Sequence, residues 1–248
     1  MKPVLLIARH PRFSLGAVEK DHRLLDEVAR HLSAGHDITV LTEEEISSRP
    51  VPQQVAAVFS MARSAEVLDW LDRVEAAGVP VVNTPGGVRR CADRHWQMQQ
   101  FAESGLSVPT ENASADCWLK RGDGWTSSAG DTVRCRNREE EEQAKARFRE
   151  QGFGKVFRQD HVEGRHVKFY GVGRGFFWSA SPSLKRHAKT LAEMAIRNGV
   201  PVFGGDAIEK ADGACCFIDF NDCPSFGPCR DEAALAIAQY INERIRIE

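Results

Sequence analysis

The sequence contains no long apolar run and little net charge of either sign. No apolar stretch approaches the roughly 20 residues that cross a bilayer, and the first apolar residues are soon followed by Arg9, His10 and Pro11. We therefore expect neither a membrane span nor a signal peptide. A formal net charge of −2 over 248 residues gives no global attraction for nucleic acid or for an anionic membrane. Any anionic ligand must be bound by a local cluster, and we expect a cytoplasmic protein.

Paired metal-binding cysteines are also missing. The sequence has seven cysteines but no Cys-x-x-Cys pair, which excludes paired zinc knuckles. The adjacent Cys215 and Cys216 would point to opposite faces of a strand, which suits two small core residues. We therefore predict reduced structural thiols.

The first third of the chain alternates short apolar runs with helical patterns. The patterns predict strands at 4–8, 38–41, 55–59 and 79–82, and helices at 21–34 and 65–77. Strands that alternate with helices indicate a parallel sheet. The segment after the first strand, ARHPRFSLGAVEKDH, lacks a glycine-rich phosphate loop. Nucleotide binding by this part of the chain alone is therefore not expected.

The pattern becomes antiparallel after the turn-rich segment NTPGG, which begins at Asn83. A helix with Asp93 near its start leads into a small sheet-and-helix unit, in which DCWLKRGDG, TVRCR and GKVFRQDHVEG are the expected strands. A third, antiparallel unit begins near Arg165 and is closed by a terminal helix at 231–245. We therefore predict an α/β protein with three parts, at residues 1–83, 84–160 and 161–248.

The last two predicted strands form a hairpin that brings two carboxylates together. With Asp212-Gly213 as a two-residue turn, the facing pairs are Lys210 with Cys215, Ile208 with Phe217, and Asp206 with Asp219. Residues two apart share a face, so Asn221 joins the two aspartates, and Ile208 and Phe217 form an apolar floor beneath them.

Two carboxylates about 5 Å apart repel each other, and a divalent cation or a shared proton usually relieves the repulsion. Three hard oxygen donors, here Asp206, Asp219 and Asn221, are typical of Mg²⁺. A different hairpin register, or an aspartate that only caps a turn, is the alternative.

The order of these signals resembles the ATP-grasp superfamily over nearly the whole chain. The segment VVNTPGGVRRCADRHWQMQQFAESGLSVPT is similar to the family's junction, and WLKRGDG is similar to its lid strand. VFRQDHVEG resembles the hinge that receives adenine, and GGDAI followed by FIDFNDCPSF resembles the paired metal-binding strands. The resemblance implies an ATP-grasp fold, with an N-terminal parallel α/β domain, a small lid and a C-terminal antiparallel α+β catalytic part.

Within the superfamily, VKFYGVG, SPSLKRH and IDFNDCPSF resemble inositol 1,3,4-trisphosphate 5/6-kinases. RimK-like and D-alanine ligases more often have Arg where Lys168 stands and Glu where Asp219 stands. Two departures from the inositol kinases concern the acceptor side. The spacing from Gln159 to Lys168 is shorter, and Ser225 replaces the usual glycine.

The resemblance implies a role for each matching residue. Mg²⁺ would be held by Asp206, Asp219 and Asn221, ATP phosphates by Arg94, Lys120, Lys168 and Arg186, and adenine by Gln159 and the backbone at His161 and Val162. The catalytic candidates are Lys168, which would face the γ-phosphate, and Arg186. From the residues alone, the alternatives are a solvated charge for Lys120, which its place before Arg-Gly-Asp-Gly disfavours, and an ordinary outward-facing strand residue for Lys168.

An acceptor site is expected where the N-terminal part meets the catalytic part. The candidates are Arg9, His10, Arg12, Arg63, Arg89, Arg90, Ser225 and Arg230. Ligands gather at the ends of strands in open parallel sheets, and this density of arginine suits an anionic small molecule, either a phosphate ester or a carboxylate. Surface charges on loops are the alternative for each arginine, and a local hydrogen-bond partner is the alternative for His10.

The resemblance leaves two enzymatic functions open, because both use the same ATP site. The first is an ATP- and Mg²⁺-dependent kinase that phosphorylates a hydroxyl of a small polyol or phosphorylated polyol. The second is a carboxylate–amine ligase that acts through an acyl phosphate. A catalytically silent binding module is a third alternative. For each of these we expect a monomer or homodimer.

Overall fold

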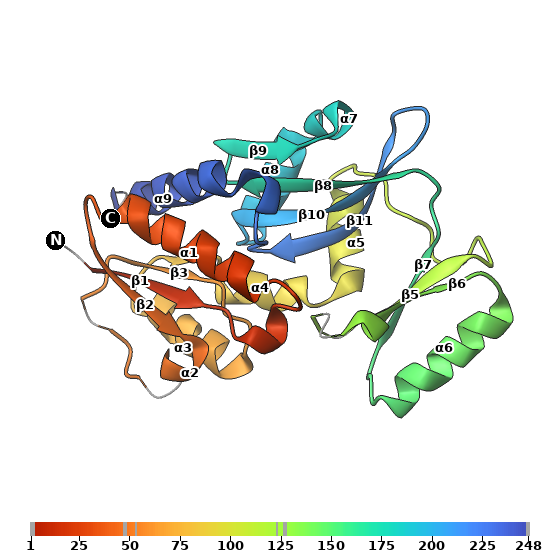
Figure 1. Cartoon of the computed structure of the whole chain (residues 1–248), viewed down its shortest axis with the longest axis horizontal. Helices are drawn as coiled ribbons and strands as arrows, with labels where there is room; N and C mark the ends of the chain where they lie inside the picture. Colours follow the sequence, from red (N-terminus) through yellow and green to blue (C-terminus); the bar gives the residue numbers. More distant parts are fainter. Residues whose placement is uncertain (1–2, 47–48, 53, 123, 126–127, 247–248) are drawn as a thin grey trace.

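The computed structural model describes residues 3–46, 49–52, 54–122, 124–125 and 128–246 and contains three sheets (Figure 1). The first sheet is parallel, with the order β2-β1-β3-β4. Its strands are β1 (Pro3–Ala8), β2 (Asp37–Thr42), β3 (Ala57–Ser60) and β4 (Val81–Val82). The connecting helices are α1 (Val18–Leu32), α2 (Glu43–Ile46) and α3 (Ala65–Ala76), with a short 3₁₀ helix, η1 (Pro11–Phe13). The predicted parallel sheet is confirmed.

The second sheet is small and antiparallel, with the order β6-β5-β7. It consists of β5 (Cys117–Arg121), β6 (Thr132–Cys135) and β7 (Val156–Asp160), with η2 (Ala129–Asp131) and the covering helix α6 (Arg138–Glu150). The side chain of Asn137 caps α6 by accepting a hydrogen bond from the Glu140 amide, at 2.9 Å. Leu119 and Phe148 are fully buried between the sheet and the helix. We call this unit, residues 117–160, the lid.

The third sheet is the large antiparallel sheet, with the order β11-β10-β8-β9. It consists of β8 (Arg165–Val172), β9 (Phe176–Ser179), β10 (Val202–Glu209) and β11 (Cys215–Asp222). Its neighbours are the helices α4 (Pro85–Cys91), α5 (Arg94–Glu103), α7 (Pro182–Lys185) and α8 (Ala188–Arg197). An aromatic core forms between sheet and helices, where the Phe101 and Phe217 ring centroids are 5.2 Å apart.

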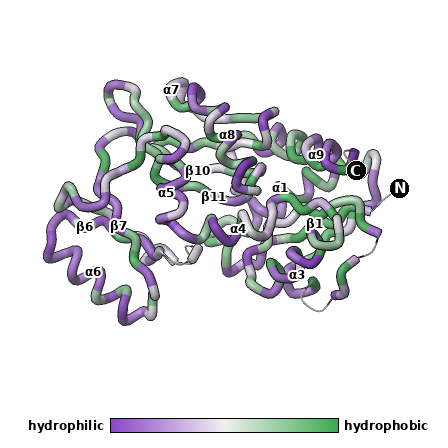
Figure 2. Tube along the Cα trace, turned by 180° about the vertical axis from the view of Figure 1, so that it is seen from behind, coloured by the Kyte–Doolittle hydropathy of each residue, from purple (hydrophilic) through white to green (hydrophobic). Residues whose placement is uncertain are grey.

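The terminal helix joins the first sheet to the large sheet. After η3 (Gly227–Cys229), α9 (Arg230–Arg246) packs beside α1, and Leu24 and Val28 of α1 share a buried cluster with Ile237 of α9 and Val172 of β8. Figure 2 shows hydrophobic residues along β1 and mostly hydrophilic residues along α6. The domain boundaries at 83 and 160 stay predictions, since α9 packs on the N-terminal part.

All seven cysteines are buried free thiols, as predicted. Within the described part of the chain, no helix is long and apolar enough to cross a membrane.

Candidate functional site

The β10–β11 hairpin places Asp206 opposite Asp219, as predicted, although its turn and the register near the turn differ from the prediction. The turn contains three residues, because the Lys210 amide donates to the Ala214 oxygen at 2.9 Å. Gly213 has a φ of 79° in this turn, which glycine adopts readily. Near the turn Glu209 faces Cys215, so the predicted pairs of Lys210 with Cys215 and of Ile208 with Phe217 are wrong. A β-bulge between Asp206 and Ala207 then shifts the register by one residue.

The bulge also changes the floor of the site. Ile218 is the extra residue on β11, and with Ile208 it lines a cavity beside the two aspartates. Phe217 is instead fully buried in the core, where it contacts Phe101 and Phe169. The predicted floor of Ile208 and Phe217 is therefore wrong, because one inserted residue turns Phe217 to the opposite face.

Basic side chains neutralise both carboxylates. Lys168 Nζ lies 2.8 Å from Asp206 Oδ1, and His166 Nε2 lies 3.0 Å from the same oxygen. Arg94 Nη1 lies 2.7 Å from Asp219 Oδ1. Burial opposes the ionisation of Asp219, but the charges of Arg94 and Lys120 outweigh it and hold its pKa below the usual value.

The donor set fits a hard divalent cation. The Asn221 amide nitrogen donates a hydrogen bond to Asp219 Oδ2 at 3.3 Å. Its amide oxygen is therefore left as a third oxygen ligand for a metal on the face of the two aspartates. Within the described residues, no group of three or more His, Cys, Asp or Glu could hold a metal ion. The chain offers two carboxylates and one amide, a partial set of oxygens that suits Mg²⁺ held jointly by protein and phosphate.

A cavity of about 490 Å³ lies between the lid and the large sheet. Its lining includes five of the seven residues predicted to contact ATP, namely Arg94, Lys120, Gln159, His161 and Val162, together with Asp206 and Asp219. The other two, Lys168 and Arg186, are among the described residues but are not part of this lining. Trp118, Thr132, His166 and Ile218 also line it and were not predicted. Trp118 directly precedes the lid-strand segment LKRG, so its alternation with Lys120 along β5 was a usable signal.

Lys120 reaches from the lid across this cavity. Its Nζ donates to the Ile218 backbone oxygen at 3.1 Å, and its side chain is buried. Burial, together with the charge of Arg94, lowers the pKa of Lys120 to about 8. A negative charge bound beside this ammonium group would therefore stabilise its protonated form and raise its pKa.

Two backbone amides, those of His161 and Val162, lie in the hinge that follows β7, and they differ in their hydrogen bonding. The His161 amide donates to the Asp116 oxygen at 2.9 Å. In the part of the chain that the structure describes, the Val162 amide has no hydrogen-bond partner. Trp118 Nε1 donates to His161 Nδ1 at 3.0 Å, so this ring nitrogen is unprotonated. Of the two backbone amides at the predicted adenine residues, that of Val162 is available to adenine and that of His161 is already hydrogen-bonded.

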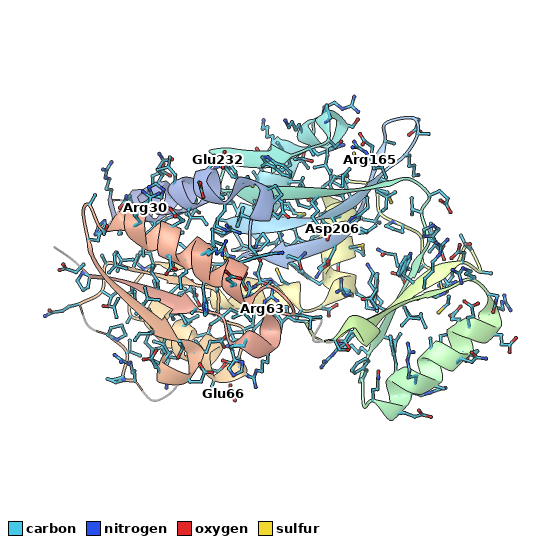
Figure 3. The ribbon with its side chains drawn as sticks, in the orientation of Figure 1. Arg30, Arg63, Glu66, Arg165, Asp206 and Glu232 are labelled. Carbon is cyan, nitrogen blue, oxygen red and sulfur yellow. The ribbon has the colours of Figure 1, made fainter. Side chains whose placement is uncertain are left out.

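A second cavity, of about 710 Å³, lies where the first and large sheets meet. It shares Arg94, Asp206 and Asp219 with the first cavity, which we call the nucleotide cavity after the predicted ATP contacts in its lining, so the two cavities meet at the carboxylates. In Figure 3, Asp206 lies on the large sheet and Arg63 lies at the junction with the first sheet. We call this second space the acceptor cavity.

Known proteins share this architecture. No protein-family model matches the sequence, and no curated protein matches it. Many solved structures resemble the chain, and three of them illustrate the likeness. A D-alanine–D-alanine ligase from Coxiella burnetii is 12% identical, with a TM-score of 0.74 and coverage of 99% of this chain and 96% of that chain. A RimK domain ATP-grasp protein from Sphaerobacter thermophilus is 16% identical, with a TM-score of 0.70 and coverage of 97% and 99%. The ATP-grasp ligase PsnB, complexed with a precursor variant, Mg and ADP, is 15% identical, with a TM-score of 0.69 and coverage of 99% of each chain.

The chain has the ATP-grasp fold. Identities of this size show the fold alone, and the resemblance to inositol kinases stays a prediction from the sequence.

The arginines at the acceptor cavity of this ATP-grasp chain are bound to buried carboxylates. Arg9 Nη1 lies 3.1 Å from Asp21 Oδ2, and Arg9 also donates to the backbone oxygens of Met61 and Cys223. Arg63 donates to both oxygens of Asp222, at 3.0 and 2.7 Å. The partners Asp21 and Asp222 were not predicted. Arg9 and Arg63 therefore join the parts of the fold rather than offering free charge to an anion.

The remaining acceptor candidates divide into two groups. Ser225 lines the acceptor cavity and donates to Asp21 Oδ1 at 2.7 Å. His10 pairs with Glu44 at 3.0 Å, Arg12 lies over the Phe13 ring, Arg89 pairs with Asp69, and Arg90 lies over the Trp96 ring. Within the described residues, none of these four and neither Arg186 nor Arg230 lines either cavity. Arg186 donates to the Gly213 oxygen at the hairpin turn, so it is far along the strands from Asp206.

Proposed function

We propose that this protein is an ATP-dependent carboxylate–amine ligase that acts through an acyl phosphate. The observation that carries the proposal is that two cavities meet at Asp206 and Asp219. The nucleotide cavity is lined by the predicted ATP-binding residues. In the acceptor cavity, Arg9 and Arg63 are already paired with buried carboxylates. A phosphorylated polyol needs several unpaired cations, because each phosphate carries up to two negative charges. A single carboxylate needs far less positive charge.

The residues around the two cavities divide the work of this reaction. Arg94 and Lys120 bind the phosphates, and the Val162 amide donates a hydrogen bond to adenine. Mg²⁺, held by Asp206, Asp219 and Asn221, would neutralise charge on the phosphates. Lys168, beside Asp206, orients the acceptor carboxylate. These groups act by positioning and charge, which is what phosphoryl transfer mainly requires.

The reaction has two steps. A carboxylate oxygen attacks the γ-phosphorus of ATP while the bond to the ADP oxygen breaks, which gives an acyl phosphate and ADP. The amine nitrogen then attacks the acyl carbon, the carbon–oxygen bond breaks, and inorganic phosphate leaves as the amine proton passes to solvent. The shared fold with proteins named as ligases supports this reading over the kinase.

The kinase is the second candidate, because Lys168 and Asp219 match the inositol kinases at positions where ligases more often have Arg and Glu. Isotope tracing separates the two reactions. With an ¹⁸O-labelled carboxylate substrate, the ligase transfers one label into inorganic phosphate, as ³¹P NMR detects. Phosphate esterified to an acceptor hydroxyl, with no need for an amine, would contradict the ligase and identify a kinase.

A further inference from the structure

At one end of the acceptor cavity, four polar side chains of the wall are paired with buried carboxylates, namely Arg9, Ser14, Arg63 and Ser225. The hydroxyls of Ser14 and Ser225 both donate to Asp21, at 2.6 and 2.7 Å. The same carboxylate pairs with Arg9, and Arg63 is held by Asp222. These hydrogen bonds satisfy one another, so this end of the cavity has little polar capacity left for a substrate.

Apart from Lys20, the side chains that remain at this end are mainly apolar. The ring centroids of Phe13 and Trp125 are 5.5 Å apart in an edge-to-face contact, and both rings are half-buried. Leu15 is 57% exposed, and it is one of only three large hydrophobic side chains that are exposed in the described residues. Phe13, Leu15 and Trp125 all line the acceptor cavity. A ligand that covered Leu15 would remove apolar surface from water, which favours binding.

The opposite end of the cavity is polar. Lys168, Asp206 and Asp219 lie there, at the junction with the nucleotide cavity. Lys20, which lies on α1 five residues after Leu15, also lines the cavity, and its side chain is exposed to solvent. The cavity therefore has a charged end for the reacting group and an apolar end away from it.

We infer that the carboxylate substrate carries an apolar side chain of aromatic or branched aliphatic size, seated against Phe13, Leu15 and Trp125. This inference rests on the proposed ligase function. The substrate carboxylate faces Lys168, and the side chain points to the rim at Leu15. Burial of that side chain gives selectivity, because even one methylene in an apolar pocket is worth roughly 10- to 200-fold in kcat/KM.

The test uses hydroxylamine as a general amine, which traps an acyl phosphate as a coloured hydroxamate. Phenylalanine, leucine, glutamine and glutamate are compared as the carboxylate, with ATP and Mg²⁺. We expect kcat/KM for phenylalanine or leucine to exceed that for glutamate at least about tenfold. The variant Leu15→Glu should remove this preference. Leu235→Glu is the matched control, since Leu235 is also exposed but lies on α9.

A binding measurement separates this inference from the proposed function. Calorimetry with Mg²⁺ and a non-hydrolysable ATP analogue compares phenylalanine with glutamate in the parent protein and in Leu15→Glu. Leu15-dependent binding of phenylalanine without any hydroxamate would support the apolar site and overturn the ligase. Equal or preferred use of glutamate, as expected if Lys20 sets the selectivity, would overturn the inference while the ligase stands. An unchanged preference in Leu15→Glu would overturn it too.

Discussion

The ammonium group of Lys120 donates a hydrogen bond to the backbone oxygen of Ile218, at 3.1 Å. This contact links β5 of the lid to the bulge in β11, next to Asp219. The lid and the carboxylate hairpin are thus joined at the residue that sets the hairpin register.

Nucleotide affinity should fall as the pH rises above about 8. Burial and Arg94 lower the pKa of Lys120 to about 8, and bound phosphates would raise it again by favouring the charged form. Between the free and the bound pKa, binding takes up one proton, so affinity falls up to about tenfold for each pH unit. Below the free pKa this group adds no pH dependence. Calorimetry with ADP, in two buffers of different ionisation enthalpy, measures the proton uptake.

The controls for this titration are two lysine variants. Lys120→Met should remove the proton uptake above about pH 8. Lys145→Ala should keep it, because Lys145 lies on α6 and pairs there with Glu141. The same pH slope in Lys120→Met as in the parent would assign the titration to another group.

The hairpin shows how far sequence reasoning reaches. The facing of Asp206 and Asp219 was predicted, although the turn is one residue longer than expected and the bulge at Ile218 restores the register. Local turn preferences cannot reveal such a bulge, because it goes with the packing of Phe217 against Phe101 and Phe169, which are distant from the hairpin in the sequence. The strand alternation and the spacing of the aspartates were enough to identify the pair.

Asp219→Asn should abolish most ATP turnover while nucleotide binding remains. The change keeps the shape of the side chain but removes a charge that would hold Mg²⁺, and we expect turnover to fall at least about 100-fold. Binding of ADP without Mg²⁺ should persist, because Arg94 and Lys120 lose a competing anion. Steady-state ADP release and Mg²⁺-free ADP titration are the measurements.

Asp212→Asn is the matched control for this carboxylate. Asp212 is exposed in the hairpin turn, where its Oδ1 accepts from the Ala214 amide at 2.9 Å. An amide oxygen can accept the same bond, so turnover should be unchanged. Full turnover in Asp219→Asn would remove Asp219 from the proposed metal site.

The acceptor region was predicted less well, because its charges are paired over long distances. Arg63 and Asp222 are 159 residues apart in the chain, and α1 supplies Asp21 to Arg9 from the other side of η1. Local spacing shows a density of arginine but not its partners. The sequence therefore located the cavity at the junction of the two sheets and overestimated its free positive charge.

Arg63→Leu should destabilise the fold rather than only weaken substrate binding. It removes the partner that donates to the Asp222 carboxylate at 3.0 and 2.7 Å. This carboxylate is 1% exposed and keeps only the longer contacts to Arg9, at 3.9 Å, and to Trp125 Nε1, at 3.3 Å, within the described residues. Breaking a buried ion pair on one side costs about 3–5 kcal/mol. Urea denaturation monitored by circular dichroism measures the loss.

Two further variants make this prediction specific. The double variant Arg63→Met with Asp222→Leu should recover much of the stability, because it removes both charges. Arg89→Ala breaks the exposed pairs with Asp69 and Asp72, and each of these pairs should contribute less than about 1 kcal/mol. Equal stability of Arg63→Leu and the parent protein would mean that Asp222 gains nothing from Arg63.

Gly205→Ala should disturb the carboxylate pair without changing any charge. A Cβ at Gly205 would clash with the backbone oxygen of Asp219 and with Phe169 Cζ, so β10 and β11 must separate. Overpacking of this kind costs about 1–3 kcal/mol, and the shift of Asp219 should lower ATP turnover as well. Gly175→Ala is the control, since a Cβ there meets no atom within 4 Å. Denaturation and ADP release are measured on both variants. Parent-like stability and turnover in Gly205→Ala would mean that the two strands can part without cost, and the close approach would then not explain the glycine beside Asp206.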